Sequence, residues 1–397
     1  MKTNKLIIPI LTGVLFAAVA HAQVDLTVTG STACRKIMYD RAAQLFDAGY
    51  TTQGGALSYA NSANQITAVG TMSNAIPSLG STVVTLRFGM SGSSQGMVDL
   101  DQSNPIGTKD PVTGFISNTV PDISFADSLP NSVAVSVPSS DLTPKTNLCV
   151  LPFVFLKNVP SLSMANVTNI TKEQAVMLMS SSGTTPGGLR GMPASFLGGA
   201  DTNVVYLFGR DIGSGTRVGV TKCIGFTSTP RQWATNGTGG IVLASSIAGS
   251  VNIPATDITG NPGDGFASGG NLVKALTGNT TGFNIIGYAG EADAGSTPAN
   301  GASQANWLSY EGVFPTHASV AAGAYPIWCY ESTYMRAGQN TGSKGAIFNK
   351  LNALMADATW QATDNTVFRP NAVALNEMTV KRGTDGGSFT TTTTAGW

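Results

Sequence analysis

The sequence predicts an α/β protein organised in two domains, and three observations lead to this fold class. Short apolar runs typical of strands are followed three times by a turn rich in glycine, serine and threonine, and then by the start of a helix. The 397 residues exceed what one hydrophobic core usually serves. Charged residues make up 11% of the chain against a usual value of about 25%, a composition common in secreted proteins.

The first 22 residues have the pattern of a signal peptide. Lys2 and Lys5 form a basic start, residues 6–20 are apolar, and Ala20-His21-Ala22 is an A-x-A cleavage site. We therefore expect cleavage after Ala22 and a periplasmic or secreted protein. No stable insertion into a membrane is expected, because no later stretch approaches the roughly 20 apolar residues of a spanning helix.

Charge and metal-ligand patterns exclude several functions. Without the first 22 residues the chain has 20 basic and 22 acidic side chains and no basic patch, so nucleic acid is not an expected partner. There is no C-x-x-C pair and no histidine at ligand spacing, so we expect no metal and no cofactor. The pairing of the four cysteines is open; they are Cys34, Cys149, Cys223 and Cys329.

The first strand, turn and helix unit lies at residues 24–46. Residues 24–29 alternate as a strand does and lead into the turn Thr29-Gly30-Ser31-Thr32. A helix is predicted over residues 34–46, with an apolar stripe inside and the charged residues Arg35, Lys36, Asp40 and Arg41 outside. Ordinary N-capping of this helix would also explain the turn.

Two further units have the same order. A strand at 83–88 leads into a turn at 89–96, and a strand at 204–208 leads into a turn at 209–216 and a helix at 217–226. Glycines let backbone N–H groups converge, a helix N-terminus carries partial positive charge, and hydroxyls add donors, so such turns suit an anion. Arg210 adds a charged fork to the last turn. A glycine–serine turn taken alone is more often an ordinary turn.

The remaining elements are predicted from periodicity and capping signals. They are a strand at 148–156, a helix after the capping box Thr171–Gln174, a loop at 180–200, a helix at 266–276, strands at 283–288 and 325–330, a helix at 345–355, and a frayed or edge segment from Thr390. Residues 227–264 are not assigned. Because open α/β sheets bind ligands beyond the carboxyl ends of their strands, we expect the hydroxyl-rich turns to converge on one crevice.

The order of these motifs resembles the periplasmic phosphate-binding proteins of ABC importers, which have the type II substrate-binding fold. Residues 210–216 are similar to that family's R-x-x-G-S-G-T signature, and residues 92–96 to its G-S-S-G turn. Asp122 and Asp127 keep the spacing of its D-F-G-A-S-D segment. Further similarities lie at Thr29–Thr32, Gly263–Gly265, Ile286–Ala289 and Ala324–Ile327.

The resemblance implies two lobes, each a mixed sheet flanked by helices, which close by hinge motion on a ligand cleft between them. Lobe 1 would comprise residues 23–148 and 328–397, and lobe 2 residues 149–327, with the chain crossing near 145–152 and 322–330. The resemblance implies a binding protein rather than an enzyme. It would capture inorganic phosphate or a similar tetrahedral oxyanion as a monomer and deliver it to an ABC transporter permease.

The resemblance also assigns the ligand contacts. Arg210, Ser214, Gly215 and Thr216 would hold oxyanion oxygens from one lobe, and Ser93, Asp127 and either Ser31 or Thr32 from the other. A carboxylate at Asp127 repels an anion unless the anion donates a proton, which hydrogen phosphate carries and sulfate lacks. The site is therefore predicted to select against sulfate, because the wrong ligand leaves a buried acceptor unpaired.

The sequence departs from the family pattern at three places. Ile212 stands where the family has an aspartate beside its arginine, so Arg210 would be oriented by Asp211 or by no near neighbour. Ala33-Cys34 replaces Thr-Phe, which leaves Ser31 and Thr32 as alternatives. Glycine-rich insertions at 181–200 and 227–262 would reshape the mouth of the cleft. We also hypothesise a disulfide between Cys149 and Cys329, which both lie near the crossings.

Two other classes of function are compatible with parts of the sequence. Residues 92–96 also fit the G-x-S-x-G nucleophile elbow of a secreted serine hydrolase, with Ser94 as nucleophile. Its base would have to be His317, which lies in a loop-like context. The low charge and the threonine run fit a secreted surface or structural protein, but that class leaves Arg210 and Asp127 beside hydroxyl turns without explanation.

Overall fold

The computed structural model describes residues 23–133, 135, 137–158, 162–181, 191–235, 241–244, 264–277, 282–295 and 306–392. The predicted signal peptide, parts of both insertions and residues 393–397 of the threonine-rich end lie outside these ranges.

A mixed sheet of 11 strands runs through the described part of the chain, in the order β10-β13-β8-β15-β7-β1-β4-β3-β2, with β14 and β9 attached to β8. Its strands are β1 (Gln23–Gly30), β2 (Thr51–Gln53), β3 (Gln65–Thr71), β4 (Val83–Gly89), β7 (Ile123–Ala126), β8 (Leu142–Lys157), β9 (Asn169–Ile170), β10 (Val205–Phe208), β13 (Asn284–Gly290), β14 (Trp307–Tyr310) and β15 (Trp328–Arg336). Strand β1 is parallel to β4 and β7, whereas β15 is antiparallel to β7 and β8.

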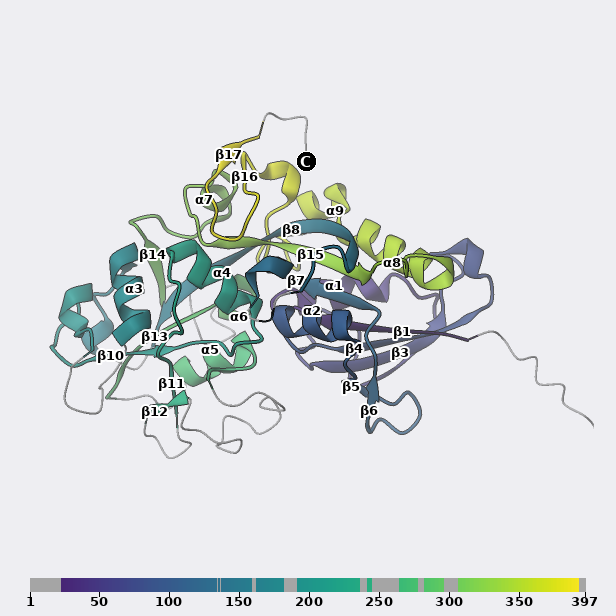
Figure 1. Ribbon diagram of the computed structural model, residues 1–397, viewed down its shortest axis with the longest axis horizontal. Coiled ribbons are helices and arrows are strands. Elements are labelled where there is room, and N and C mark those ends of the chain that lie inside the picture. The colour runs from purple at the N-terminus through teal and green to yellow at the C-terminus, as the bar shows by residue number, and fades with distance from the viewer. Residues whose placement is uncertain are drawn as a thin grey trace, which may run out of the picture.

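Strands β8 and β15 join the two halves of the molecule. The first part of β8 pairs with β15 and its last part pairs with β13, so one long strand belongs to both halves. Figure 1 shows β1, β3 and β4 on one side of this pair and β10 and β13 on the other. The segments that were expected to cross between lobes, 145–152 and 322–330, lie in β8 and at the start of β15. The lobe boundaries themselves stay a prediction.

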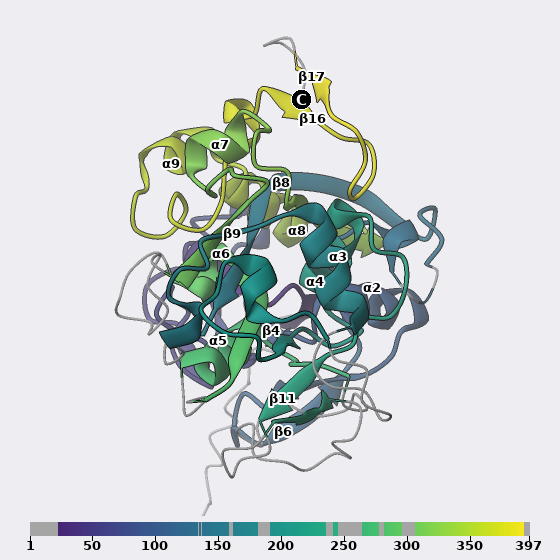
Figure 2. The ribbon, with the colours of Figure 1, turned by 90° about the vertical axis from the view of Figure 1, so that its left-hand side faces the viewer.

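Helices cover both halves of the sheet (Figure 1). Around β1 and β4 lie α1 (Arg35–Ala43), α2 (Ser93–Gln102) and α8 (Gly342–Met355), and around β10 and β13 lie α3 (Lys172–Ser181), α4 (Gly215–Ile224), α5 (Gly269–Thr277) and α6 (Glu291–Ala294). Helices α7 (His317–Ala321) and α9 (Ala358–Thr363) lie near the C-terminal end in both views (Figures 1 and 2). Two hairpins, β5 (Ile106–Lys109) with β6 (Ile116–Thr119) and β11 (Trp233–Thr235) with β12 (Ile241–Leu243), complete this part of the fold.

Most predicted elements are present, with shifted ends. The capping box at α3 is confirmed, since Thr171 Oγ1 accepts from the Gln174 backbone N–H (3.2 Å) and Gln174 Oε1 accepts from that of Thr171 (2.8 Å). Strand β8 begins six residues earlier than predicted, because its polar start pairs with β15 rather than facing a core. Strand β15 begins at Trp328 and continues to Arg336, well beyond the predicted end at residue 330.

The prediction that the charged residues of α1 lie outside is wrong for two arginines. Arg35 and Arg41 are both buried, with 3% and 4% of their surface exposed. Arg41 Nε donates to the Leu354 carbonyl (3.0 Å), and its guanidinium lies 4.1 Å from the ring centroid of Trp360. A guanidinium tolerates burial where carbonyl and aromatic partners surround it, and α8 and α9 supply them here.

The cysteines are free thiols, and they lie in pairs that differ from the hypothesised one. Cys34 contacts Cys149, and Cys223 of α4 contacts Cys329. In the ladder between β8 and β15, Cys149 lies opposite Glu331 whereas Cys329 lies opposite Leu151. The pair Cys149–Cys329 is therefore wrong, because each sulfur faces a different neighbouring element.

The C-terminal hairpin of β16 (Val380–Lys381) and β17 (Thr390–Thr391) is the edge segment that the sequence predicts. Its loop contacts both halves of the molecule. The Arg382 guanidinium stacks on Trp328, 3.7 Å from the ring centroid, and its Nη1 donates to Cys223 Sγ of α4 (3.2 Å). On the other side, Asp385 accepts a hydrogen bond from the Leu129 backbone (2.7 Å). Figures 1 and 2 show this segment at the top of the molecule, above β8.

Candidate functional site

The carboxyl ends of β1, β4 and β7 lie together, because β1 is parallel to both of its neighbours. The turn that follows β10 in the other half meets them. The backbone N–H groups of Ser94 and Gln95, at the start of α2, donate to the Gly213 carbonyl at 3.1 and 3.2 Å. The structure thus brings the three hydroxyl-rich turns into direct contact.

Arg210 is held rigidly within this contact, with 1% of its surface exposed. Its Nε donates to the Phe266 carbonyl (3.0 Å) and its Nη2 to the Ala267 carbonyl (2.8 Å). Its backbone N–H donates to the Tyr288 hydroxyl (3.2 Å). Ile212 is 45% exposed and takes no part in this arrangement. Backbone carbonyls therefore orient Arg210, and position 212, where the resemblance led us to look for an aspartate, does not.

The guanidinium of Arg210 links the two halves through hydroxyl groups. Nη2 donates to Thr32 Oγ1 (3.2 Å), after β1, and Nη1 to Thr216 Oγ1 (3.5 Å), in α4. The Thr216 hydroxyl in turn donates to Asp127 Oδ2 (3.4 Å). These contacts form one continuous chain from Thr32 to Asp127, and they favour Thr32 over Ser31 as the hydroxyl beside the arginine.

Asp127 follows β7 and has 1% of its surface exposed. Its backbone N–H donates to Ser93 Oγ (3.2 Å), while Oδ1 has no hydrogen-bond partner in the described part of the chain. Burial raises the pKa of Asp127 to about 6 from its usual 3.8, although the neighbouring Ser93 hydroxyl and the charge of Arg210 oppose this rise. At neutral pH the site therefore contains a buried carboxylate with one unused acceptor oxygen.

Gly215 makes this close packing possible. A Cβ atom at this position would lie 1.7 Å from Asp127 Oδ1 and 2.6 Å from Ser93 Cβ, which no side chain tolerates. Gly215 is also the first residue of α4, so its N–H group is one of the donors that an α-helix leaves without an internal partner. The N-terminus of α4, with its partial positive charge, thus lies beside the carboxylate.

The two remaining predicted residues lie beside the site and serve local structure. Ser31 Oγ accepts from the Cys34 backbone N–H (3.2 Å), and Ser214 Oγ accepts from that of Arg217 (3.4 Å) as the N-cap of α4. Both serines are buried. The structure gives neither of them a contact with Arg210, whereas Thr32, Ser93, Asp127, Gly215 and Thr216 are joined to one another or to Arg210.

Several residues that support the site were not identified from the sequence. Gln232 donates through Nε2 to the Arg210 carbonyl (2.9 Å), and its Oε1 accepts from the Tyr288 hydroxyl (2.8 Å). Arg217 forms an ion pair with Asp264. Asp264 lies in the glycine–aspartate–glycine motif, which was a signal, but Gln232 lies in the unassigned segment and had none. Glu331 of β15 was also not identified, because the predicted strand ended at residue 330, one residue before it.

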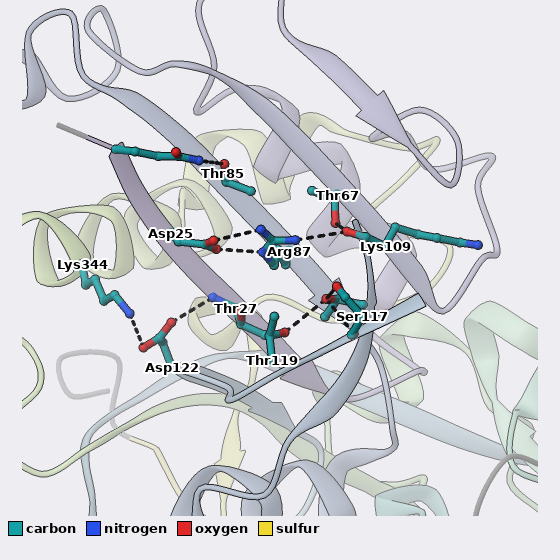
Figure 3. Close-up of polar contacts among 12 residues, drawn as sticks. Asp25, Thr27, Thr67, Thr85, Arg87, Lys109, Ser117, Thr119, Asp122 and Lys344 are labelled. Carbon is teal, nitrogen blue, oxygen red and sulfur yellow. Dashed lines mark hydrogen bonds and ion pairs between the residues drawn. The ribbon is translucent and has the colours of Figure 1, made fainter. Parts of the chain in front are cut away.

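Asp122, the other aspartate of the β7 segment, lies outside the site. Its Oδ2 accepts from the Thr27 backbone N–H (2.9 Å) and its Oδ1 from Lys344 Nζ (2.6 Å). Figure 3 shows this group in the same region, around β1, as the ion pair between Arg87 and Asp25. Asp122 therefore fixes β7 to β1 and α8, and of the two aspartates only Asp127 is available to a ligand.

The serine hydrolase alternative finds no support in the geometry. His317 is the first residue of α7, and its Nε2 lies 2.9 Å from Glu377 Oε2. Figures 1 and 2 both place α7 beside the C-terminal hairpin and away from α2, which carries Ser94. Among the described residues no cluster of three or more His, Cys, Asp or Glu side chains is arranged to hold a metal ion. No helix in the described ranges is both long and apolar enough to cross a membrane.

Comparison with known proteins identifies the fold. No protein-family model matches the chain, and no curated protein matches it significantly in sequence. A crystal structure from Clostridium perfringens, of a protein assigned as a phosphate ABC transporter substrate-binding protein with bound phosphate, is similar with a TM-score of 0.51 and 14% identity, over 88% of this chain and 99% of that one. An ABC-type phosphate transport receptor from Vibrio cholerae has a TM-score of 0.45 and 16% identity, over 85% of this chain and 96% of that one.

The first of these similarities covers nearly the whole of the compared chain, and it agrees with the predicted architecture. The two halves joined by β8 and β15 and the meeting of turns at the carboxyl ends of the strands are the features of this structure that agree with the prediction. The chain therefore has a mixed α/β fold similar to that of the C. perfringens protein.

Proposed function

We propose that this chain is an exported solute-binding protein that captures inorganic phosphate, as hydrogen phosphate, between its two lobes. The observation that carries the proposal is the buried carboxylate of Asp127, which has an unused oxygen and lies in the same contact as the buried guanidinium of Arg210. The C. perfringens protein of similar fold binds phosphate, which supports the choice of ligand. Fold alone does not determine the ligand, so the argument rests on the site.

The chemistry of the site favours a protonated oxyanion. Arg210, the hydroxyls of Thr32, Ser93 and Thr216, and the N–H group of Gly215 are donors suited to the oxygens of a tetrahedral anion. Asp127 accepts only, so it repels any anion that brings no proton. Hydrogen phosphate donates its proton to Asp127, whereas sulfate leaves two negative groups facing each other in a buried site.

Delivery to a transporter follows as part of the same proposal. We take the mature protein to begin after Ala22, to act as a monomer, to need no cofactor and to pass phosphate to an ABC transporter permease. The lobes would comprise 23–148 with 328–397 and 149–327, and Ser31 and Ser214 would support the neighbouring contacts rather than hold the anion directly. Ligand binding would draw the lobes together about β8 and β15.

Calorimetric titration of the purified mature protein with phosphate, arsenate and sulfate tests the proposal. We expect binding of phosphate and arsenate and much weaker binding of sulfate. In Asp127→Asn the preference for phosphate over sulfate is expected to fall by about one to two orders of magnitude, the worth of one hydrogen bond to a charged group. Asp122→Asn is the matched control, because it changes the aspartate at the other end of β7 and should retain the preference.

Two results would contradict the proposal. Sulfate bound by the wild type as tightly as phosphate would overturn the proton-donor argument, and no binding of either anion would overturn the function. Specific labelling of Ser94 by a fluorophosphonate would favour the hydrolase instead.

A further inference from the structure

Glu331 is a second buried carboxyl group, and it lies beside Asp127 of the candidate site. It lies in β15 and has 0% of its surface exposed. Neither of its oxygens has a hydrogen bond of good geometry to the described residues, and the Ser31 hydroxyl is the polar group that lies toward it. A buried carboxyl group without such partners is costly, so its position at a site needs an explanation.

The strand register places Glu331 next to Asp127. Strands β7 and β15 are antiparallel, with Thr333 opposite Phe125 and Ser332 opposite Ala126. One further step along both strands puts Glu331 opposite Asp127, where Cβ atoms are about 5 Å apart in a regular ladder. Asp127 is accordingly the charged group with the strongest electrostatic effect on Glu331.

A β-bulge directs this side chain. The ladder between β15 and β8 shifts register between Glu331 and Ser332, so that Glu331 lies opposite Cys149 and Ser332 opposite Asn147. Bulges bend a strand locally and re-aim a side chain, and they are common beside functional sites. Here the irregularity falls on the residue that faces Asp127.

Both carboxyl groups cannot be ionised together without a large cost. Burial raises the pKa of Glu331 well above its usual 4.5, and the charge of Asp127 raises it further. Cys149 on β8 and Cys34 before α1 also face this group, whereas the charges of Arg210 and Asp385 act on Asp127. When two carboxyl groups share one site, one of them keeps its proton over a wide range of pH.

We propose that Glu331 is a specificity-determining residue of the anion site, and that it and Asp127 hold one proton between them, so that the site presents a single negative charge to its ligand. The part of this inference that concerns phosphate rests on the proposed function. The sharing of one proton by Glu331 and Asp127 does not depend on it. The protonated carboxyl group of Glu331 donates toward Asp127, and Asp127 keeps an acceptor for the proton of hydrogen phosphate. Loss of the shared proton at alkaline pH adds a second charge and expels the anion.

The first test measures the pH dependence of phosphate affinity by calorimetry. Above the ionisation of the pair, wild-type affinity is expected to fall by about tenfold per pH unit, since binding then requires uptake of one proton. Glu331→Gln cannot ionise and is expected to lose this fall. The exposed glutamate of α3 supplies the control Glu173→Gln, which should follow the wild type. Comparison of proteins at each pH cancels the ionisation of phosphate itself.

A second measurement needs no ligand. The infrared carbonyl absorption of a protonated carboxylic acid is expected in the wild type at neutral pH, and Glu331→Gln should remove one such band while Glu173→Gln keeps it. In Asp127→Asn the band of Glu331 should disappear at a lower pH than in the wild type, because the neighbouring charge is gone.

The outcomes separate the two proposals. Parallel pH profiles for wild type and Glu331→Gln, in a protein that binds phosphate, would overturn this inference and leave the proposed function intact. A folded Glu331→Gln with an unchanged infrared spectrum would overturn it as well. If phosphate does not bind but the band of Glu331 is present, the shared proton stands and the proposed function fails. Proton uptake on phosphate binding by the wild type tests the same point if Glu331→Gln does not fold.

Discussion

Removing the charge of Asp127 should stabilise the fold at neutral pH, although it damages the site. The pKa of this carboxyl group is raised by burial from 3.8 to about 6. Because the pKa is higher in the folded state, the contribution of this group to the free energy of unfolding is fully present below its pKa in the unfolded chain. That contribution is lost as the pH rises through about 6. A shift of about 2 units corresponds to about 3 kcal/mol. Asp127→Asn escapes this loss because an amide does not ionise.

Urea unfolding in phosphate-free buffer from about pH 4 to about pH 7.5 measures the effect. The free energy of unfolding of Asp127→Asn relative to wild type should rise by about 3 kcal/mol over this range. Asp122→Asn should change stability in the opposite direction at neutral pH, because its carboxylate accepts hydrogen bonds from Thr27 and Lys344. The reasoning is refuted if the difference between Asp127→Asn and wild type is independent of pH, or if the variant is less stable than wild type at pH 7.5.

Three other predictions concern the arginine, the glycine and the cysteines. Arg210→Ala should lower phosphate affinity in calorimetry by at least about tenfold, the worth of one charge-assisted hydrogen bond, and unaltered affinity would exclude Arg210 from the site. Gly215→Ala should lower the free energy of unfolding by about 1–3 kcal/mol through overpacking against Asp127, whereas Gly383→Ala, at a position with open space, should not; equal urea midpoints for the two would contradict the packing. Oxidised glutathione should accept electrons by thiol–disulfide exchange and pair Cys34 with Cys149 and Cys223 with Cys329. The second pair should form first, because hydrogen bonds from Cys329 and the charge of Arg382 lower the pKa of Cys223 to about 6, and a peptide linking Cys149 to Cys329 would refute the arrangement.

The part of the site that lies in one short segment could be predicted from the sequence. Residues 210–216 combine strand end, glycine turn and helix start, so their local chemistry is visible without knowledge of the fold. The structure agrees, with Gly215 as the first residue of α4 and Ser214 as its N-cap. The general architecture could be predicted for a similar reason, because short apolar runs and capping signals are local.

Contacts between distant segments could not be predicted. Thr32 and Arg210 are 178 residues apart, and only the meeting of the two halves decides that Thr32 rather than Ser31 faces the guanidinium. Arg41 was expected to be exposed because its partners, Leu354 and Trp360, belong to helices far along the chain. Glu331 lies in the site because of the register in which β15 pairs with β7. No spacing in the sequence indicates that register.

The loop between β16 and β17 has a consequence for how a ligand would be retained. With Asp385 bonded to the Leu129 backbone on one side and Arg382 bonded to Cys223 of α4 on the other, it adds a third link between the halves to those made by β8 and β15. Because this loop is bonded to both halves of the molecule, it limits how far the halves can move apart. If this link favours the closed form, less binding energy is spent on closure, so a ligand bound between the halves would be held more tightly and released more slowly.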